Sequence, residues 1–142
     1  MSWLKAMREA EPPEPESPIA TVVIGNLKPD LHETAKEMVR KSLKKAGFKT
    51  VDVGKGTAPE VFASKAKEVN ADIVAASINT SAAKENLPQL DAALEAADLK
   101  GKVVFMIGGA VVRKEDADKI GALYGKNRDE AVAIATKAIK ET

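Results

Sequence analysis

The residues in this sequence best suited to chemistry are Asp30 and His32, which lie two positions apart. His32 is the only histidine among 142 residues. A carboxylate beside a histidine can hold one ring N–H, and the other ring nitrogen is then free to bind a metal. The alternative is a solvated histidine in a polar turn, with Asp30 as a turn or N-cap residue. The pair by itself leaves both interpretations open.

The surroundings of the pair indicate where it lies in the fold. An apolar run over residues 19–24 comes before it, and an amphipathic helical pattern begins near Glu33. A loop that contains Gly25 and Pro29 joins the two. Asp30 and His32 are therefore predicted at the carboxyl end of a first strand, where open α/β sheets bind their ligands.

The rest of the chain alternates between strand and helix patterns. Gly47 is predicted to end the first helix, and Pro59 to begin the second. Strands are predicted over residues 19–24, 49–53, 72–78, 103–107 and 122–124, and helices over residues 33–46, from 59 onward, 88–97, 114–120 and 129–139. Repeated strand–helix units of this kind form a parallel sheet with right-handed crossovers.

The composition of the strands predicts their order. The first, third and fourth strands are almost continuously apolar, which is typical of central strands covered on both faces. The second is polar and the fifth is short. We therefore predict an α/β, flavodoxin-like (Rossmann-like), doubly wound five-stranded parallel sheet in the order 2-1-3-4-5, with helices on both faces. In this order the loop that carries Asp30 and His32 and the loop after Ile78 flank one crevice, and the loop with Gly108 and Gly109 lies beside them.

The N-terminal residues 1–18 differ in composition from the domain predicted over residues 19–142. Residues 1–10 are predicted to form a short helix, and residues 11–18 form a linker rich in proline and glutamate that cannot continue it. Trp3 either packs back on the domain or contacts a partner, and packing is favoured.

Composition excludes several classes of function. The hydrophobic fraction of 44% and the charged fraction of 30% are those of a globular protein, and no apolar run is long enough for a membrane span. Cysteine is absent, so thiolate chemistry is excluded. A net charge of +1 and 4% aromatic residues predict no binding of nucleic acid. No secretory signal is evident, and we expect a cytoplasmic protein.

Three segments, taken together, resemble a known family. Asp30-Leu31-His32, Ser77-Ile78-Asn79-Thr80 and Gly108-Gly109 are similar to the motifs Asp-x-His-x-x-Gly, Ser-x-Leu and Gly-Gly of the cobalamin (vitamin B12)-binding domain. This family occurs in corrinoid methyltransferase proteins and in adenosylcobalamin-dependent mutases. The resemblance covers roughly residues 19–140, and the three motifs fall on the expected strand–helix loops.

The resemblance implies cobalamin as the cofactor. In this family the lower benzimidazole is buried in a slot between the first and third strands, and a histidine takes its place below the cobalt. His32 is then the lower axial ligand of cobalt, and Asp30 orients it. The glycines are expected to let the nucleotide tail pass close to the backbone. The implied cofactor-binding residues are Asp30, Leu31, His32, Ala35, Ser77, Asn79, Thr80, Gly108, Gly109, Tyr124 and Gly125.

Two positions depart from the family motifs. Ala35 stands where the family has glycine, and Asn79 stands where it has leucine. The loop between Ser77 and Pro88 is also longer than in the methyltransferase members. If these departures crowd the slot, Ala35→Gly and Asn79→Leu should strengthen cofactor binding.

The resemblance leaves three functions open. The first is a non-catalytic corrinoid carrier that presents methyl-cobalamin to a separate methyltransferase subunit. The second is the small subunit of an adenosylcobalamin-dependent mutase, and the third is the same fold with cofactor binding lost or altered. A signalling receiver is disfavoured because the third strand ends in Ser77-Ile78-Asn79, without an acid. Either of the first two needs a catalytic partner, and a homo-oligomer stays open.

Overall fold

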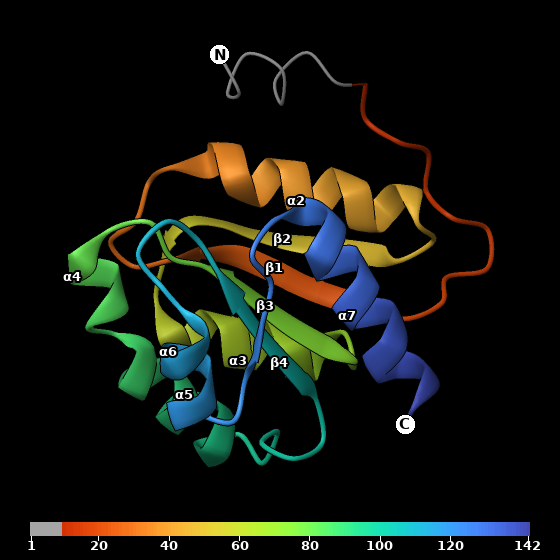
Figure 1. The fold of residues 1–142 in the computed structure, drawn as a ribbon. Coiled ribbons are helices and arrows are strands. Elements are labelled where there is room, and N and C mark those ends of the chain that lie inside the picture. Colours follow the sequence, from red (N-terminus) through yellow and green to blue (C-terminus); the bar gives the residue numbers. More distant parts are fainter. Residues whose placement is uncertain (1–9) are drawn as a thin grey trace.

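The computed structural model describes residues 10–142 (Figure 1). Most of the predicted N-terminal helix, including Trp3, lies outside the described residues. In chain order the elements are β1 (Thr21–Leu27), α2 (Glu33–Lys45), β2 (Lys49–Thr57), α3 (Pro59–Glu68), β3 (Ile73–Ser77), α4 (Ser81–Lys84), α5 (Leu87–Ala96), β4 (Val104–Gly108), α6 (Lys114–Lys119), β5 (Leu123–Tyr124) and α7 (Arg128–Lys140).

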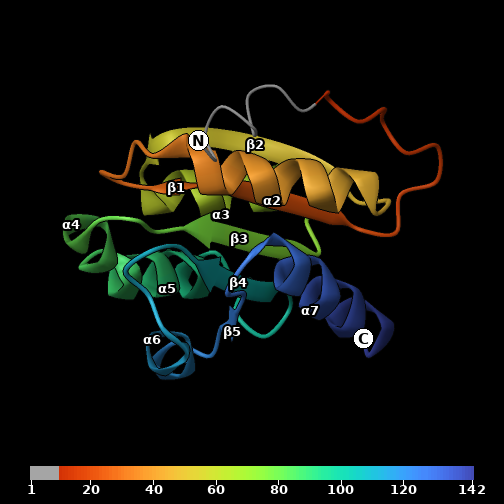
Figure 2. The ribbon, with the colours of Figure 1, turned by 45° about the horizontal axis from the view of Figure 1, so that its top comes forward.

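The strands form a parallel five-stranded sheet in the order β2-β1-β3-β4-β5, which confirms the predicted topology. Helices α2 and α7 lie side by side over one face (Figures 1 and 2). Residues of α3, α5 and α6 belong to the apolar core on the other face. Every residue of β3 is buried, as expected for a strand covered on both sides.

The chain leaves α2 through the turn that the sequence predicts. Gly47 has a φ of +106°, which glycine adopts without steric penalty. Its N–H donates to the carbonyl of Lys44, and the N–H of Phe48 donates to that of Leu43. This is a Schellman motif, and it directs the chain into β2.

The register of the central strands brings the three predicted motifs together. Asn26 of β1 pairs with Ser77 of β3, and Ser77 pairs with Gly108 of β4. The three strands therefore end at the same level. Their following loops, which carry Asp30, Asn79 and Gly109, share one edge of the sheet.

Several element bounds differ from the prediction. The strand predicted over residues 19–24 is β1, which continues through the buried residues Asn26 and Leu27. The strand predicted over residues 49–53 extends to Thr57, beyond register shifts in its pairing with β1. Helix α4 was not predicted, and its N-terminus is capped by the Thr80 hydroxyl, which accepts from the N–H of Ala83 at 3.1 Å.

The acidic linker before β1 is fixed to α2 by ion pairs. The Glu11 carboxylate accepts two hydrogen bonds from Arg40, at 2.8 and 2.6 Å, and one from Lys44 at 2.7 Å. These hydrogen bonds, led by those from Arg40, lower the pKa of Glu11 to about 2. Glu14 also pairs with Lys44, at 2.8 Å. The described part of the linker is therefore held by charge as well as stiffened by proline.

No helix within residues 10–142 has the length and apolar character that crossing a membrane would require.

Candidate functional site

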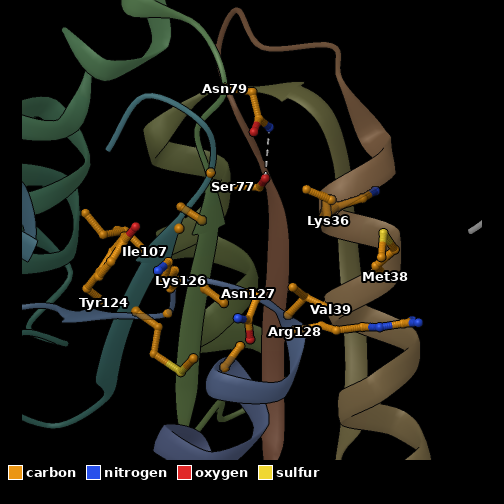
Figure 3. A pocket seen from close by; sticks show the side chains of 18 of the residues that line it. Lys36, Met38, Val39, Ser77, Asn79, Ile107, Tyr124, Lys126, Asn127 and Arg128 are labelled. Atoms are coloured by element: carbon orange, nitrogen blue, oxygen red, sulfur yellow. Dashed lines mark hydrogen bonds between the residues drawn. The ribbon is translucent and has the colours of Figure 1, made fainter. Parts of the chain in front are cut away.

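A cavity of about 470 Å³ opens between the sheet and the helices α2 and α7 (Figure 3). This volume lies in the range that is typical of small-molecule sites. Its apolar lining comes from the sheet and from both helices, and includes Ile24, Ala75, Met106, Met38, Val39 and Ala131. The cavity covers β1 and β3, as the slot predicted from the family resemblance does, and extends over β4.

Most of the predicted cofactor-binding residues line this cavity, namely Ala35, Ser77, Asn79, Gly108, Gly109, Tyr124 and Gly125. Asp30, Leu31 and His32 lie outside the lining, in the loop between β1 and α2. Thr80 also lies outside it and caps α4 instead. A cofactor role for Thr80 stays a prediction.

The predicted contact between Asp30 and His32 is formed. The Asp30 Oδ1 atom accepts from the backbone N–H of His32 at 3.0 Å and lies 3.0 Å from the ring Nδ1. Asp30 is fully buried, whereas the His32 side chain is 71% exposed. Because Nδ1 faces the carboxylate, the ring presents Nε2 as its free nitrogen. The geometry is that of a histidine oriented to bind a ligand from solvent.

The second oxygen of Asp30 is also fully engaged. Its Oδ2 atom accepts from Asn26 Nδ2 at 3.2 Å, from the backbone N–H of Asn79 at 2.9 Å and from Asn79 Nδ2 at 2.8 Å. Burial raises the pKa of the Asp30 carboxyl, but the hydrogen bonds from His32, Asn79 and Asn26 outweigh burial and lower it overall. Asp30 is therefore a buried anion with fixed donors.

Asn79 has more contacts than its place in a motif predicts. Its Nδ2 also donates to Ser77 Oγ at 3.1 Å, and its Oδ1 accepts from the N–H of Ala110 at 2.9 Å (Figure 3 shows the first of these). A leucine at this position could make none of these hydrogen bonds. The interpretation of Asn79 as a residue that crowds the slot is therefore incomplete.

Sequence reasoning did not assign a role to Asn26 or Lys36. Asn26 is a polar residue at the end of an otherwise apolar strand, and it is fully buried. Lys36 is also fully buried although it is charged. It shares the inward helical spacing of Val39 and Leu43, and this spacing was the available signal.

Lys36 attaches the first turn of α2 to β2. Its ammonium lies 2.8 Å from Asp52, 3.1 Å from Glu33 and 3.5 Å from Glu37. Burial lowers the pKa of Lys36, but hydrogen bonding and charge from Asp52 outweigh it and raise the pKa overall. Because Lys36 and Ala35 both line the cavity, this ion-pair cluster fixes one wall of the site.

The two glycines at the end of β4, Gly108 and Gly109, are required by the protein's own backbone. A Cβ on Gly109, whose φ is +124°, would lie 2.0 Å from the carbonyl oxygen of Ile78. A Cβ on Gly108 would lie 2.7 Å from the carbonyl oxygen of Gly125. Close packing of loops at the sheet edge therefore explains both glycines, without the tail clearance that the sequence suggested.

Leu31 is a large apolar side chain that is 62% exposed beside His32. Its Cδ2 atom lies 3.1 Å from the position that a Cβ on Gly56 would occupy. Leu31 therefore extends toward the end of β2 and forms exposed apolar surface beside His32.

These features fit a corrinoid. Within residues 10–142, no group of three or more His, Cys, Asp or Glu side chains could hold a bare metal ion. A corrin ring brings its own equatorial nitrogens, so one axial ligand such as His32 Nε2 is enough. The apolar cavity suits an aromatic lower base, and the buried Ser77 hydroxyl lies in its wall.

Comparison with known proteins agrees with this fit. The B12 binding domain family matches residues 20–135. Trimethylamine corrinoid protein 2 of Methanosarcina acetivorans is 42% identical over 123 residues, which cover 86% of this chain and 57% of that protein. The dimethylamine corrinoid protein of Methanosarcina barkeri is 36% identical over 124 residues, which cover 87% of this chain and 58% of that protein.

Among solved structures, a novel cobalamin-binding protein from Desulfitobacterium hafniense DCB-2 has a TM-score of 0.80 at 28% identity. The match covers 83% of this chain and 58% of that one. The chain thus spans a little over half the length of these relatives. Since the family match covers most of the chain and relatives named corrinoid proteins are up to 42% identical to it, the chain belongs to the B12-binding domain family and its cofactor is cobalamin.

Proposed function

We propose that this protein is a corrinoid carrier, which holds cobalamin and presents its upper face to a separate methyltransferase subunit. The observation that carries the proposal is the exposed His32 ring, oriented by a buried Asp30 that Asn79 of the cavity wall also contacts. The names of the relatives, trimethylamine and dimethylamine corrinoid proteins, support a methyl-transfer role over a mutase role. When bound, the cofactor supplies the cobalt that carries the methyl group.

The residues of the chain would act as a holder. His32 Nε2 would bind the lower face of the cobalt, and Asp30 would keep the ring in the tautomer that leaves this nitrogen free. The cavity between α2 and α7 would take the nucleotide tail and shield it from water. We propose that the methyltransferase subunit docks on the rim formed by residues 79–87 and 111–115.

The first test is spectroscopic. Apo-protein mixed with hydroxocobalamin should give the absorption spectrum of a cofactor whose lower base is released and replaced by histidine. His32→Ala should lose this spectrum while circular dichroism shows an unchanged fold. Added imidazole should restore nitrogen ligation in His32→Ala, because the cavity that holds the tail is intact. A wild-type spectrum from His32→Ala without imidazole would remove His32 from the site.

The second test separates a carrier from an independent enzyme. The protein loaded with methyl-cobalamin should not turn over methylamines or methyl acceptors repeatedly unless a methyltransferase subunit is added. Sustained turnover by the loaded chain alone would overturn the carrier proposal.

A further inference from the structure

Two asparagine amides hold the Asp30–His32 turn, one from each of the two neighbouring strands. Asn26, at the end of β1, donates from Nδ2 to Asp30 Oδ2 at 3.2 Å and to the His32 carbonyl at 3.0 Å. Asn79, after β3, donates from Nδ2 to the same two atoms, at 2.8 and 3.5 Å. The turn is therefore held by the same pair of contacts from both sides.

The orientation of the Asn26 amide follows from its neighbours. Both groups in front of Nδ2 are acceptors, so a flipped amide would place its oxygen against two other oxygens. In the observed orientation, Oδ1 is buried and has no hydrogen-bond partner within residues 10–142. A buried oxygen without a partner is unfavourable. Its presence indicates that the two donor contacts determine the position of this side chain.

Asn79 extends the contact to the third loop. Its backbone N–H also donates to Asp30, at 2.9 Å, and its Oδ1 accepts from Ala110 after β4, at 2.9 Å. A single side chain thus joins the loops that follow β1, β3 and β4. The loops after β3 and β4 line the cavity at Asn79, Gly109 and Ala110, and a change at Asn79 would loosen all three loops.

We propose that Asn79, together with Asn26, is a positioning residue that holds Asp30, and through it His32, in the geometry of a cobalt ligand before the cofactor binds. This inference rests on the proposed function. With five donor contacts on its two oxygens, the Asp30 carboxylate keeps Oδ1 directed at His32 Nδ1. A preformed turn loses less conformational entropy when the cofactor binds than a loose one does. Asn79→Leu should therefore weaken binding, although it restores the family motif.

The experiment compares wild type with three variants. Asn79→Leu removes every side-chain hydrogen bond at this position. Asn79→Asp keeps an acceptor for Ala110 but removes the amide donors to Asp30 and Ser77. Asn86→Leu is the matched control, because Asn86 Nδ2 also connects a segment after β3 to the loop after β1, through the Lys28 carbonyl at 2.7 Å. Asn86 belongs to the proposed docking rim but not to the residues that line the cavity, so Asn86→Leu is a control for cofactor binding by the protein without its partner.

Each protein is loaded with cob(II)alamin and studied by electron paramagnetic resonance. With the histidine labelled with ¹⁵N, a superhyperfine doublet reports ligation by His32, whereas the ¹⁴N of the cofactor's own benzimidazole would give a triplet. We expect Asn79→Leu to lose most of the nitrogen-ligated fraction and to bind cobalamin about tenfold more weakly, the effect of losing hydrogen bonds to a charged group. Asn79→Asp should resemble Asn79→Leu, and Asn86→Leu should resemble wild type. Tighter binding or full ligation in Asn79→Leu would overturn the proposal, as would wild-type behaviour of Asn79→Asp.

A measurement on the apo-proteins keeps this inference separate from the proposed function. The nitrogen chemical shifts of the His32 ring report which of its two nitrogens carries the proton. Wild type should show the Nδ1-protonated tautomer, and Asn79→Leu a mixture of tautomers. A mixture in wild type would overturn the positioning role. Absence of nitrogen ligation in loaded wild type, with the tautomer fixed in the apo-protein, would instead contradict the proposed function.

Discussion

The two ends of helix α2 carry ion pairs that differ in burial and in what they hold. In its first turn, the fully buried Lys36 pairs with Asp52 of β2 and fixes the wall of the cavity. Farther along, Arg40 and Lys44 pair with Glu11 of the linker, whose side chain is 47% exposed. The Arg40 and Lys44 side chains are themselves only 12% and 8% exposed, so the difference lies in the carboxylate, which is half-exposed on Glu11. A buried charge that loses its partner is strongly unfavourable, whereas a pair with one solvated partner contributes less. The Lys36–Asp52 cluster therefore stabilises the folded domain, and the cluster around Glu11 attaches the linker to α2.

Asp52→Ala should give the largest effect on stability. It leaves the Lys36 ammonium buried, with Glu33 and Glu37 as its remaining partners among residues 10–142. We expect a loss of about 3 kcal/mol in the free energy of unfolding, the lower end for a broken buried pair. Lys36→Met removes the charge and keeps most of the volume. Asp52 is one-third exposed and also accepts from Gly54 N–H at 2.8 Å. Lys36→Met should therefore cost only about 1 kcal/mol.

Urea unfolding of both variants measures this difference, provided that the m-value does not change. Equal losses in Asp52→Ala and Lys36→Met would show that the burial of Lys36 does not set the cost. The two ion-pair clusters of α2 would then not differ in stability for the reason of burial given above.

Glu11→Gln tests the other end of α2 and should have a smaller effect, about 1 kcal/mol, because the Glu11 carboxylate is half-exposed and water can solvate it, although its partners Arg40 and Lys44 are largely covered. High salt should reduce it further. Since the pKa of Glu11 is lowered from 4.5 to about 2, the ionised carboxylate contributes stability above about pH 4.5. That contribution is lost as the pH falls toward 2. Glu11→Gln should therefore lose less stability than wild type over this range.

The matched control is Glu16→Gln, since Glu16 is an exposed glutamate of the same linker. Its unfolding curve should follow wild type at each pH. If Glu11→Gln and Glu16→Gln have the same effect, the linker is not anchored specifically by Glu11.

The difference between these regions also explains what the sequence could predict. The strand order followed from composition, because β3 is apolar up to Ser77 at its end and β2 is polar. The pair Asp30 and His32 could be identified from residue type and spacing alone. Hydrogen bonds between residues far apart in sequence could not. Asn79 reaches Asp30 across 49 residues and Ala110 across 31, so its role becomes visible only when the sheet brings three loops together.

Errors in the element bounds have a similar origin. Asn26 is a polar residue that is usual in loops, but it extends β1 because its amide has partners inside the protein. The partners of Glu11 are also distant, at positions 40 and 44, so the sequence showed a linker and not its anchor.

Ala35→Gly should have the smallest effect, and it separates the two departures from the family motif. Ala35 is exposed in the first turn of α2 and its methyl group lies at the cavity mouth, next to Lys36 in sequence. Glycine there should lower the free energy of unfolding by about 0.5 kcal/mol, the cost of added backbone freedom near a helix end. Cobalamin affinity should rise a few-fold, because removing the methyl group relieves crowding without removing any hydrogen bond. Calorimetric titration with hydroxocobalamin measures this gain against Asn79→Leu, for which we expect the opposite sign. If both variants bind cobalamin more tightly, both departures from the family motif act by crowding the cofactor. If Ala35→Gly binds more weakly, the rigidity of the first turn of α2 matters more for binding than the space that the Ala35 methyl group occupies.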